Sequence, residues 1–243
     1  MPHNPAPSAL HGLIVPPAAG EVPADGARLY PGLRFCASGL GLGSVTPAGY
    51  DAVIDDVAAH ARKLADQGAT VISLMGTSLS FYRGAAFNRS LTEAMTAATG
   101  LPCTTMSHAV LRALDSLQAR RVALATAYVD DVNERLEIFL REEGLDVTAC
   151  SSLGISGVEA MAKVRTDTLV ALCEEALAAA PDSDAILLSC GGLLTLDAIA
   201  IMEGRHGVPV VSSSPAGFWD VVRAGGGDPA APGQGMLFAP RAQ

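Results

Sequence analysis

An apolar run, one thiol and two glycines follow one another in the stretch Ala185-Ile-Leu-Leu-Ser-Cys-Gly-Gly-Leu-Leu-Thr-Leu-Asp197. This order predicts a buried strand, a tight turn at Cys190 and then a helix. A thiol at such a turn would be half exposed and would face the positive end of the helix dipole, which favours reactivity. A cysteine is more often a small buried hydrophobic residue, so its role depends on the rest of the chain.

A similar pattern occurs earlier in the chain. The segment Thr70-Val-Ile-Ser-Leu-Met-Gly-Thr77 resembles Ala185-Ile-Leu-Leu-Ser-Cys-Gly-Gly192, and Gly76 then matches Cys190. The segment Leu101-Pro-Cys-Thr-Thr-Met-Ser107 likewise matches Val208-Pro-Val-Val-Ser-Ser-Ser214. An internal repeat of this kind indicates two related halves.

Segments typical of strands and of helices alternate through both halves. Strands are expected at His11–Val15, Arg34–Ser38, Ala69–Met75, Leu101–Met106, Arg121–Tyr128, Leu145–Cys150, Asp184–Ser189 and Gly207–Ser212. Helices are expected at Tyr50–Gln67, Asn88–Thr99, Ser107–Leu117, Asp130–Glu143, Thr166–Ala180 and Ala216–Ala224. The alternation predicts an α/β protein of two pseudo-symmetric halves, each a mainly parallel four-stranded sheet flanked by helices.

The repeat also suggests where the halves divide and where a site would lie. We expect residues 1–117 to form the N-terminal half, completed by the C-terminal segment 214–243, and residues 118–213 to form the C-terminal half. The glycine-rich end, 225–233, is predicted to be a flexible tail. Ligand sites in parallel sheets lie beyond the carboxyl ends of the strands. An active site is therefore expected in the cleft between the halves, with Gly76 and Cys190 on opposite walls.

The composition indicates a globular protein. Of its 243 residues, 49% are apolar and 17% are charged, which suits a chain with a sizeable core. The formal net charge is −9 and no basic cluster occurs, so nucleic acid and anionic membrane are poor candidate partners. The acidic surface and the expected tail are compatible with a monomer.

Other features of the chain favour the cytoplasm. Met1–Ser8 lacks a basic segment followed by a long apolar one, so no secretory signal is expected. The nearly apolar stretch Ala185–Met202 contains glycines and Asp197 and has no charged anchors, which favours a buried strand and helix over a membrane span. The cysteines are odd in number and widely spaced, and reduced thiols are expected at Cys36, Cys103, Cys150, Cys173 and Cys190.

Common catalytic motifs are incomplete. The run Gly39-x-Gly41-x-Gly43 follows a predicted strand but lacks the third glycine of a dinucleotide site. The run Gly76-Thr-Ser-Leu-Ser80 is close to a nucleophile elbow, but Ser80 replaces its last glycine. The five histidines show no metal-ligand spacing. Neither a metal nor a cofactor is therefore expected.

Polar groups remain at the predicted strand exits. Thr77, Ser78, Tyr128 and Cys190, with backbone N–H groups of the glycine turns, would suit a carboxylate or a developing oxyanion. Helix capping by Thr77 and Ser78, and a core position for Tyr128, are equally ordinary explanations.

Six segments, spread over nearly the whole chain, resemble one family. They are Val15–Gly20, Pro23–Tyr30, Ala37–Pro47, Ser73–Gly84, Leu188–Asp197 and Ser212–Trp219. The chain is similar here to the arylmalonate decarboxylases, which belong to the aspartate/glutamate racemase superfamily. Enzymes of that superfamily typically use two cysteines on opposite faces of the substrate. This chain departs from them at the first position, which is Gly76.

The resemblance implies a cofactor-independent, enantioselective decarboxylation of small dicarboxylates, the α-aryl(-α-methyl)malonates, to α-arylacetates or α-arylpropionates. It implies that Cys190 is the proton donor. It implies a dioxyanion hole for the retained carboxylate, formed by Thr77, Ser78, Tyr128, Cys190 and Gly191. It implies an apolar pocket lined by Pro16, Leu42, Val45, Tyr50, Leu79, Val158, Met161 and Gly192.

Two other functions remain open at this point. One is a racemase or a maleate-type cis–trans isomerase of the same superfamily, against which the missing thiol at Gly76 argues. The other is a dicarboxylate-binding protein that uses the same cleft without catalysis. A single thiol fits the decarboxylase best, because it would deliver a proton to one face of a planar intermediate. Cys190 would then have to be a thiol when the carbanion forms, and an ordinary cysteine pKa near 8.5 permits this.

Overall fold

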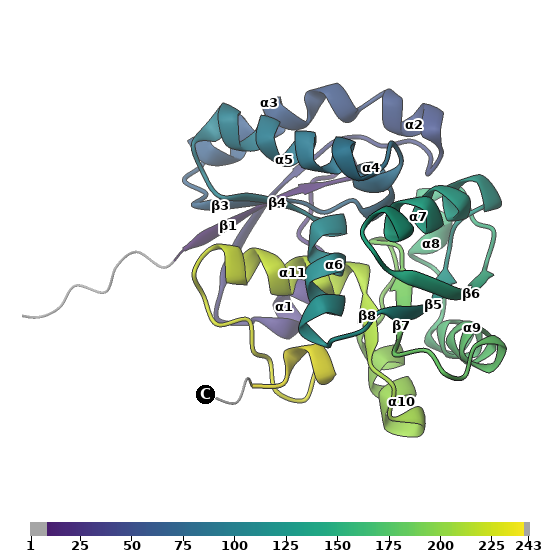
Figure 1. The fold of residues 1–243 in the computed structure, drawn as a ribbon. Helices are drawn as coiled ribbons and strands as arrows, with labels where there is room; N and C mark the ends of the chain where they lie inside the picture. The colour runs from purple at the N-terminus through teal and green to yellow at the C-terminus, as the bar shows by residue number, and fades with distance from the viewer. Residues whose placement is uncertain (1–8, 241–243) are drawn as a thin grey trace, which may run out of the picture.

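The computed structural model describes residues 9–240, which form two four-stranded parallel sheets flanked by helices (Figure 1). The first sheet has the order β2-β1-β3-β4 and the second the order β6-β5-β7-β8. Their strands are β1 (Leu10–Val15), β2 (Arg34–Gly39), β3 (Val71–Leu74), β4 (Cys103–Thr105), β5 (Arg121–Thr126), β6 (Asp146–Ser152), β7 (Ala185–Ser189) and β8 (Val210–Ser212). The predicted fold class is confirmed, and the predictions made for residues 1–8 and 241–243 lie outside the described residues.

The two sheets repeat one topology. β3 holds the same place in its sheet as β7, and β4 the same place as β8. These are the strands on which the sequence repeat was based. Every residue of β3 and of β7 is buried, as expected for central parallel strands with helices on both faces. The edge strands β2 and β6 are only partly covered.

Helices connect the strands and cover the sheets. They are α1 (Ala24–Leu29), α2 (Pro47–Asp51), α3 (Val57–Asp66), α4 (Thr77–Phe81), α5 (Ala85–Thr99), α6 (Met106–Ser116), α7 (Asp130–Glu142), α8 (Val158–Met161), α9 (Thr166–Ala179), α10 (Leu196–His206) and α11 (Ser213–Ala224), with short 3₁₀ turns η1 (Ile54–Asp56) and η2 (Met236–Phe238). Thr46 and Thr105 cap α2 and α6 by accepting backbone N–H groups. Gly100 ends α5 in the left-handed conformation that glycine adopts most readily.

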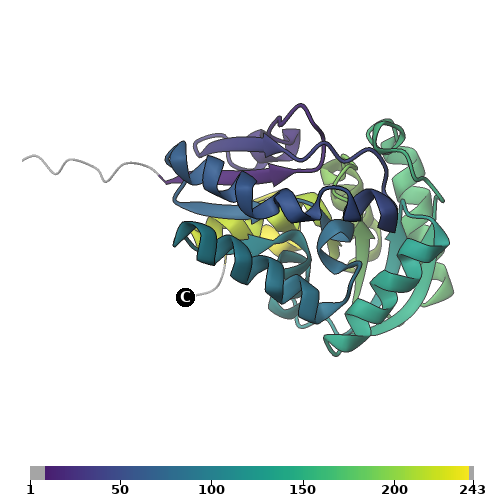
Figure 2. The same cartoon turned by 90° about the horizontal axis from the view of Figure 1, so that it is seen from above.

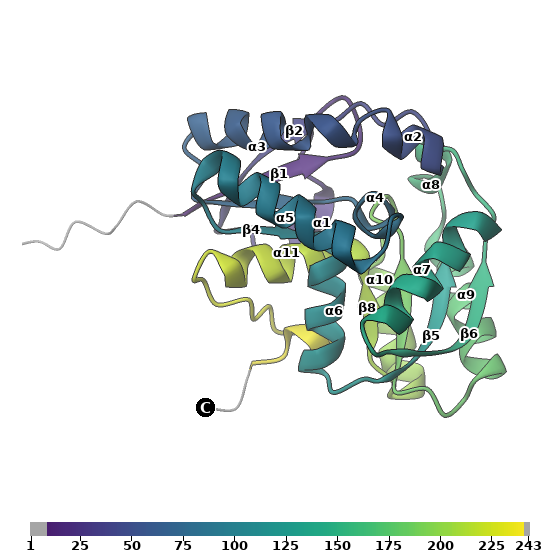
Figure 3. The ribbon, with the colours of Figure 1, turned by 45° about the horizontal axis from the view of Figure 1, so that its top comes forward.

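The last helix packs on the first sheet. α11 lies against α1, α6, β3 and β4, and Figure 2 shows it among the elements of the N-terminal half. α6 in turn contacts β8 of the second sheet, and Figure 3 shows it between α11 and β8. The predicted division of the chain needs the C-terminal segment to pack on the N-terminal half, as α11 does. The division itself, residues 1–117 with 214–243 and residues 118–213, stays a prediction.

Three expectations about local structure were wrong. The helix expected over Tyr50–Gln67 is broken into α2, η1 and α3, because Val53 leaves helical dihedrals (φ −127°, ψ −13°). The segment 225–233 is not a flexible tail, since Ala231 is buried and its N–H group donates to the carbonyl of the buried Phe238 at 3.1 Å. The helix after Cys190 begins only at Leu196. Helices α1 and α8 were not predicted, because they are too short to show a helical period, and α4 was anticipated only as a possible helix capped by Thr77 and Ser78. No helix within residues 9–240 has both the length and the apolar character that crossing a membrane requires.

Candidate active site

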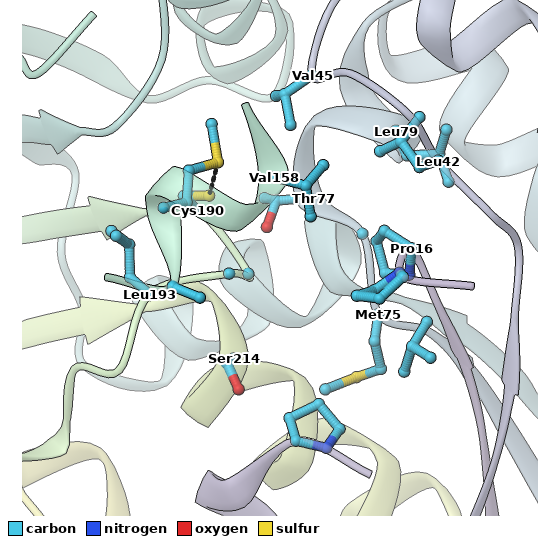
Figure 4. A pocket seen from close by; sticks show the side chains of 18 of the residues that line it. Pro16, Leu42, Val45, Met75, Thr77, Leu79, Val158, Cys190, Leu193 and Ser214 are labelled. Carbon is cyan, nitrogen blue, oxygen red and sulfur yellow. Dashed lines mark hydrogen bonds between the residues drawn. The ribbon is translucent and has the colours of Figure 1, made fainter. Parts of the chain in front are cut away.

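A cavity of about 370 Å³ lies where the two halves meet (Figure 4). Pro16, Gly76 and Cys190 line it, and they follow β1, β3 and β7 at the carboxyl ends of these strands. This is where parallel sheets generally hold their ligands. The cavity is closed on one side by contact between the halves: Ser44 and Gly157 form a β-bridge, and the N–H group of Val45 donates to the carbonyl of Ser156 over 3.0 Å.

One wall is the turn between β3 and α4. Gly76 is the N-cap residue of α4, and Thr77 and Ser78 follow in its first turn, where backbone N–H groups have no partner within the helix. The buried Ser80 hydroxyl holds this turn, because it lies 2.9 Å from the carbonyl oxygens of both Gly76 and Thr77. Its Oγ also lies 2.7 Å from Ser107 Oγ, which itself donates to the Thr77 carbonyl at 3.0 Å. This structural role of Ser80 was not predicted, because in the sequence the residue stands only where a nucleophile elbow would have its last glycine.

The opposite wall carries the thiol. Cys190 is 4% exposed and its Sγ lies 3.2 Å from Met161 Sδ. Burial raises the pKa of the Cys190 thiol to about 11, against the opposing effects of the Gly192 N–H group and the Tyr128 hydroxyl. The expectation of a half-exposed thiol beside a helix end was therefore wrong. The protonation state of the Cys190 thiol is therefore set by its buried, apolar surroundings. The dipole of α10 does not act on it, because that helix begins only at Leu196, six residues further on.

Most of the predicted site residues line the same cavity. From the proposed anion site these are Thr77, Ser78, Cys190 and Gly191, together with Gly76 opposite the thiol. From the proposed apolar pocket they are Pro16, Leu42, Val45, Leu79, Val158, Met161 and Gly192. The structure thus brings these residues together, while their roles stay predictions.

Tyr128 and Tyr50 lie behind the cavity lining, and the Tyr128 hydroxyl is near enough to Cys190 to oppose the rise in the thiol pKa. Their proposed roles stay predictions. Both side chains are buried, and neither is among the residues that line the cavity. The Tyr128 hydroxyl lies 3.3 Å from Ser189 Oγ, and its pKa is raised well above 10 by burial and then by the nearby Cys190. Asn133 holds the Tyr128 backbone by donating to its carbonyl at 3.2 Å. The Tyr50 hydroxyl has no hydrogen-bond partner among the described residues.

Other lining residues were not among the predicted site residues, although most of them lie in the segments that resemble the family. They include Val22, Pro23, Asp25, Met75, Leu193 and Ser214. Asp25 lies on the unpredicted helix α1, and Ser214 is in the first turn of α11. Neither belongs to a motif with recognisable spacing. No group of three or more His, Cys, Asp or Glu side chains within residues 9–240 is arranged to hold a metal ion.

Comparison with known proteins agrees with this geometry. A family model described as arylmalonate decarboxylase matches residues 11–238. Arylmalonate decarboxylase of Bordetella bronchiseptica is 75% identical over 228 residues, which cover 93% of this chain and 95% of that protein. A crystal structure of a double mutant of arylmalonate decarboxylase in its liganded form has a TM-score of 0.94 at 72% identity, covering 95% of this chain and 99% of that one. Maleate isomerase of Pseudomonas putida is 26% identical over 176 residues, which cover 70% of this chain and 68% of that protein.

Fold and cavity together define the class as an α/β enzyme whose site lies between two parallel sheets. The chain belongs to the arylmalonate decarboxylase family. The predicted family is confirmed, and with it the prediction of a carboxy-lyase related to the maleate isomerases. The liganded state of the mutant structure supports the expected small-molecule ligand.

Proposed function

We propose that the protein decarboxylates α-aryl and α-aryl-α-methylmalonates, without a cofactor, to α-arylacetates and α-arylpropionates of one configuration. The observation that carries this proposal is the pairing of one buried thiol, Cys190, with a glycine, Gly76, across a single cavity.

The substrate itself can take up the electrons. Loss of CO₂ leaves an electron pair on the central carbon, and an aryl ring with a second carboxylate can delocalise it as a planar enediolate. The donors for its oxygens would be the Thr77, Ser78 and Tyr128 hydroxyls and the N–H groups of the Cys190-Gly191 turn. Donors of this kind are worth about 3–4 kcal/mol each in comparable oxyanion sites. The Thr77 hydroxyl is 2.9 Å from Met106 Sδ, a weak acceptor, so turning toward a substrate oxygen would cost little.

The apolar part of the cavity favours release of CO₂. Leu42, Val45, Leu79 and Val158 come together on one side of the cavity, as Figure 4 shows. An ionised carboxylate among such side chains loses much of its solvation, whereas neutral CO₂ does not. The carboxylate placed there would therefore be the one that leaves, and the one held by the polar wall would be retained.

Cys190 would then protonate the carbanion. With a pKa of about 11, the thiol carries its proton throughout the neutral range. A planar enediolate can accept a proton on either face, and Gly76 offers none from the opposite wall. One face is therefore protonated, and the product has one configuration. A racemase or a maleate-type isomerase of the same superfamily would be expected to have a thiol at both positions.

Incubation with phenylmalonate and with α-methyl-α-phenylmalonate tests the proposal. We expect release of CO₂ and formation of phenylacetate and of 2-phenylpropionate. If neither substrate is turned over while both are bound, the chain is a dicarboxylate-binding protein. Turnover of maleate or epimerisation of an amino acid, in place of decarboxylation, would favour the isomerase or racemase alternative.

We also infer that the protein works as a monomer in the cytoplasm. All five cysteines are free, as expected for a reducing compartment. The large exposed apolar side chains, Leu33, Ile138, Leu194 and Met236, belong to separate parts of the chain. Gel filtration with light scattering measures the oligomeric state directly, and a mass of twice 24.8 kDa would contradict this inference.

A further inference from the structure

Two buried polar side chains in the cavity have no part in the decarboxylation described above. Asp25 is 5% exposed and Ser214 1% exposed as whole residues, and both line the cavity. Ser214 Oγ has no hydrogen-bond partner among the described residues. Burial raises the pKa of the Asp25 carboxyl, and the nearby Ser214 hydroxyl opposes that rise. The two side chains are not placed to form a hydrogen bond with each other. Burying such groups without partners is costly, so their retention calls for an explanation.

The other two buried carboxylates in residues 9–240 are fully paired. Asp220 accepts hydrogen bonds from Thr104, Arg112 and Arg223 at 2.6–2.8 Å. Glu203 accepts the backbone N–H groups of Val210 and Met236 at 2.9 and 2.8 Å. Asp25 is the exception, since no described residue donates a hydrogen bond to it. Its surroundings therefore differ from those of a structural carboxylate.

The fold holds Asp25 and Ser214 together. Asp25 is on α1 and Ser214 in the first turn of α11, and these helices pack against each other. Their close approach requires a glycine at position 26, because a Cβ there would collide with the ring of Phe218 on α11. In Figure 4, Ser214 lies on the side of Thr77 and Cys190 away from Val45 and Leu42. Ser214 thus lies in the part of the cavity away from Leu42 and Val45, and the packing of α1 on α11 holds Asp25 at the same end.

We propose that Asp25 and Ser214 form a polar subsite that binds a hydroxyl group on the aryl substituent of the substrate. The inference rests on the proposed function in that it names the substrate class of the same site. A carboxylate accepts hydrogen bonds, and a serine hydroxyl can donate one. A hydroxyl group satisfies both at once, by donating to Asp25 and accepting from Ser214. The preferred substrates are then hydroxyarylmalonates, with the leaving carboxylate on the apolar side and the ring directed toward α1.

Kinetics with 3-hydroxyphenylmalonate, 4-hydroxyphenylmalonate and phenylmalonate test this subsite. The quantity of interest is the ratio of kcat/KM for each hydroxylated substrate to kcat/KM for phenylmalonate, in the wild type and in the variants. The substituent's own electronic effect on the carbanion is the same in every variant and cancels in that comparison. We expect Ser214→Ala and Asp25→Asn each to lower the ratio about tenfold for at least one isomer, because the first variant deletes one hydrogen bond to the substrate hydroxyl and the second replaces its charged acceptor with a neutral one.

Ser212→Ala is the matched control. Ser212 is also buried with an unpartnered hydroxyl, but it does not line the cavity, so the ratio should stay at the wild-type value. Ratios that are the same in all variants for both isomers would overturn the proposal. If no arylmalonate is turned over at all, the proposed function fails separately. The subsite is then judged by calorimetric binding of hydroxyphenylacetates against phenylacetate: a preference that Ser214→Ala abolishes supports it, and equal affinity in the wild type overturns it.

Discussion

Gly76 and Cys190 follow equivalent strands of the two sheets and line one cavity from its two walls. The pair is chemically unequal, because only one member has a side chain that can carry a proton. The thiol is buried beside Met161 and is protonated at neutral pH, whereas the glycine is held in a turn fixed by Ser80. A symmetric fold therefore supports one-sided chemistry.

Removal of the thiol should abolish most of the activity. We expect Cys190→Ser to lower kcat for phenylmalonate by about a hundredfold or more, because general acids typically contribute on the order of 10²–10⁴-fold. Binding of phenylacetate, measured by calorimetry, should remain. The exposed Cys150 provides the control, since Cys150→Ser removes a thiol outside the cavity and should leave kcat unchanged. Equal turnover in the wild type and in Cys190→Ser would exclude Cys190 as the proton donor.

The activity should be insensitive to pH until the thiol ionises. Burial raises the pKa of Cys190, so the protonated, competent form prevails below about pH 11 and is lost as the pH rises through that value. We expect kcat to be flat across neutral pH and to fall at the alkaline end. Thiolate absorbance near 240 nm, as the difference between wild type and Cys190→Ser, reports the ionisation itself. A thiolate signal already present at pH 7 would show that the apolar surroundings do not control this group.

A thiol at position 76 should allow the product to racemise. A Cβ built there lies 3.1 Å from Leu79 Cβ and 3.4 Å from Pro16 Cγ, so the neighbours must shift by only a few tenths of an ångström. We expect Gly76→Cys to racemise optically pure 2-phenylpropionate slowly, with chiral chromatography as the measurement. Gly76→Ala introduces the same Cβ without the thiol and should not racemise it. Full retention of optical purity in Gly76→Cys would mean that the two walls do not face the same carbon.

The hydroxyl of Ser80 should stabilise the fold and position the first wall. Ser80→Ala removes the hydroxyl that links Gly76 and Thr77 to Ser107, while the Gly76 carbonyl keeps the backbone N–H of residue 80 and the Thr77 carbonyl keeps the Ser107 hydroxyl. We expect a loss of about 1–3 kcal/mol in the free energy of unfolding, measured by denaturant titration. The turn that carries Thr77 should also be less well held, so KM for phenylmalonate should rise. Ser90→Ala, at an exposed serine on α5, should change the stability by no more than about 0.5 kcal/mol.

The sequence allowed the architecture and most of the cavity to be predicted, because both depend on local patterns that repeat. The match between the segments at β3 and β7 located both walls, and the glycine opposite the thiol was visible in it. What could not be predicted depends on contacts between distant segments. The burial of Cys190, and with it the raised pKa, comes from residues such as Met161. Asp25 and Ser214 meet only because α1 and α11 pack together, and Phe238 is ordered only because it reaches the core.

Exchange of the two wall residues tests the central claim most directly. The double variant Gly76→Cys/Cys190→Ser moves the single thiol to the opposite wall while the rest of the cavity is unchanged. The measurement is the configuration of the 2-phenylpropionate formed from α-methyl-α-phenylmalonate, by chiral chromatography, for the wild type and the double variant. We expect a single enantiomer from the wild type and its mirror image from the double variant. The same enantiomer from both, or a racemate from the wild type, would contradict protonation from one wall by Cys190.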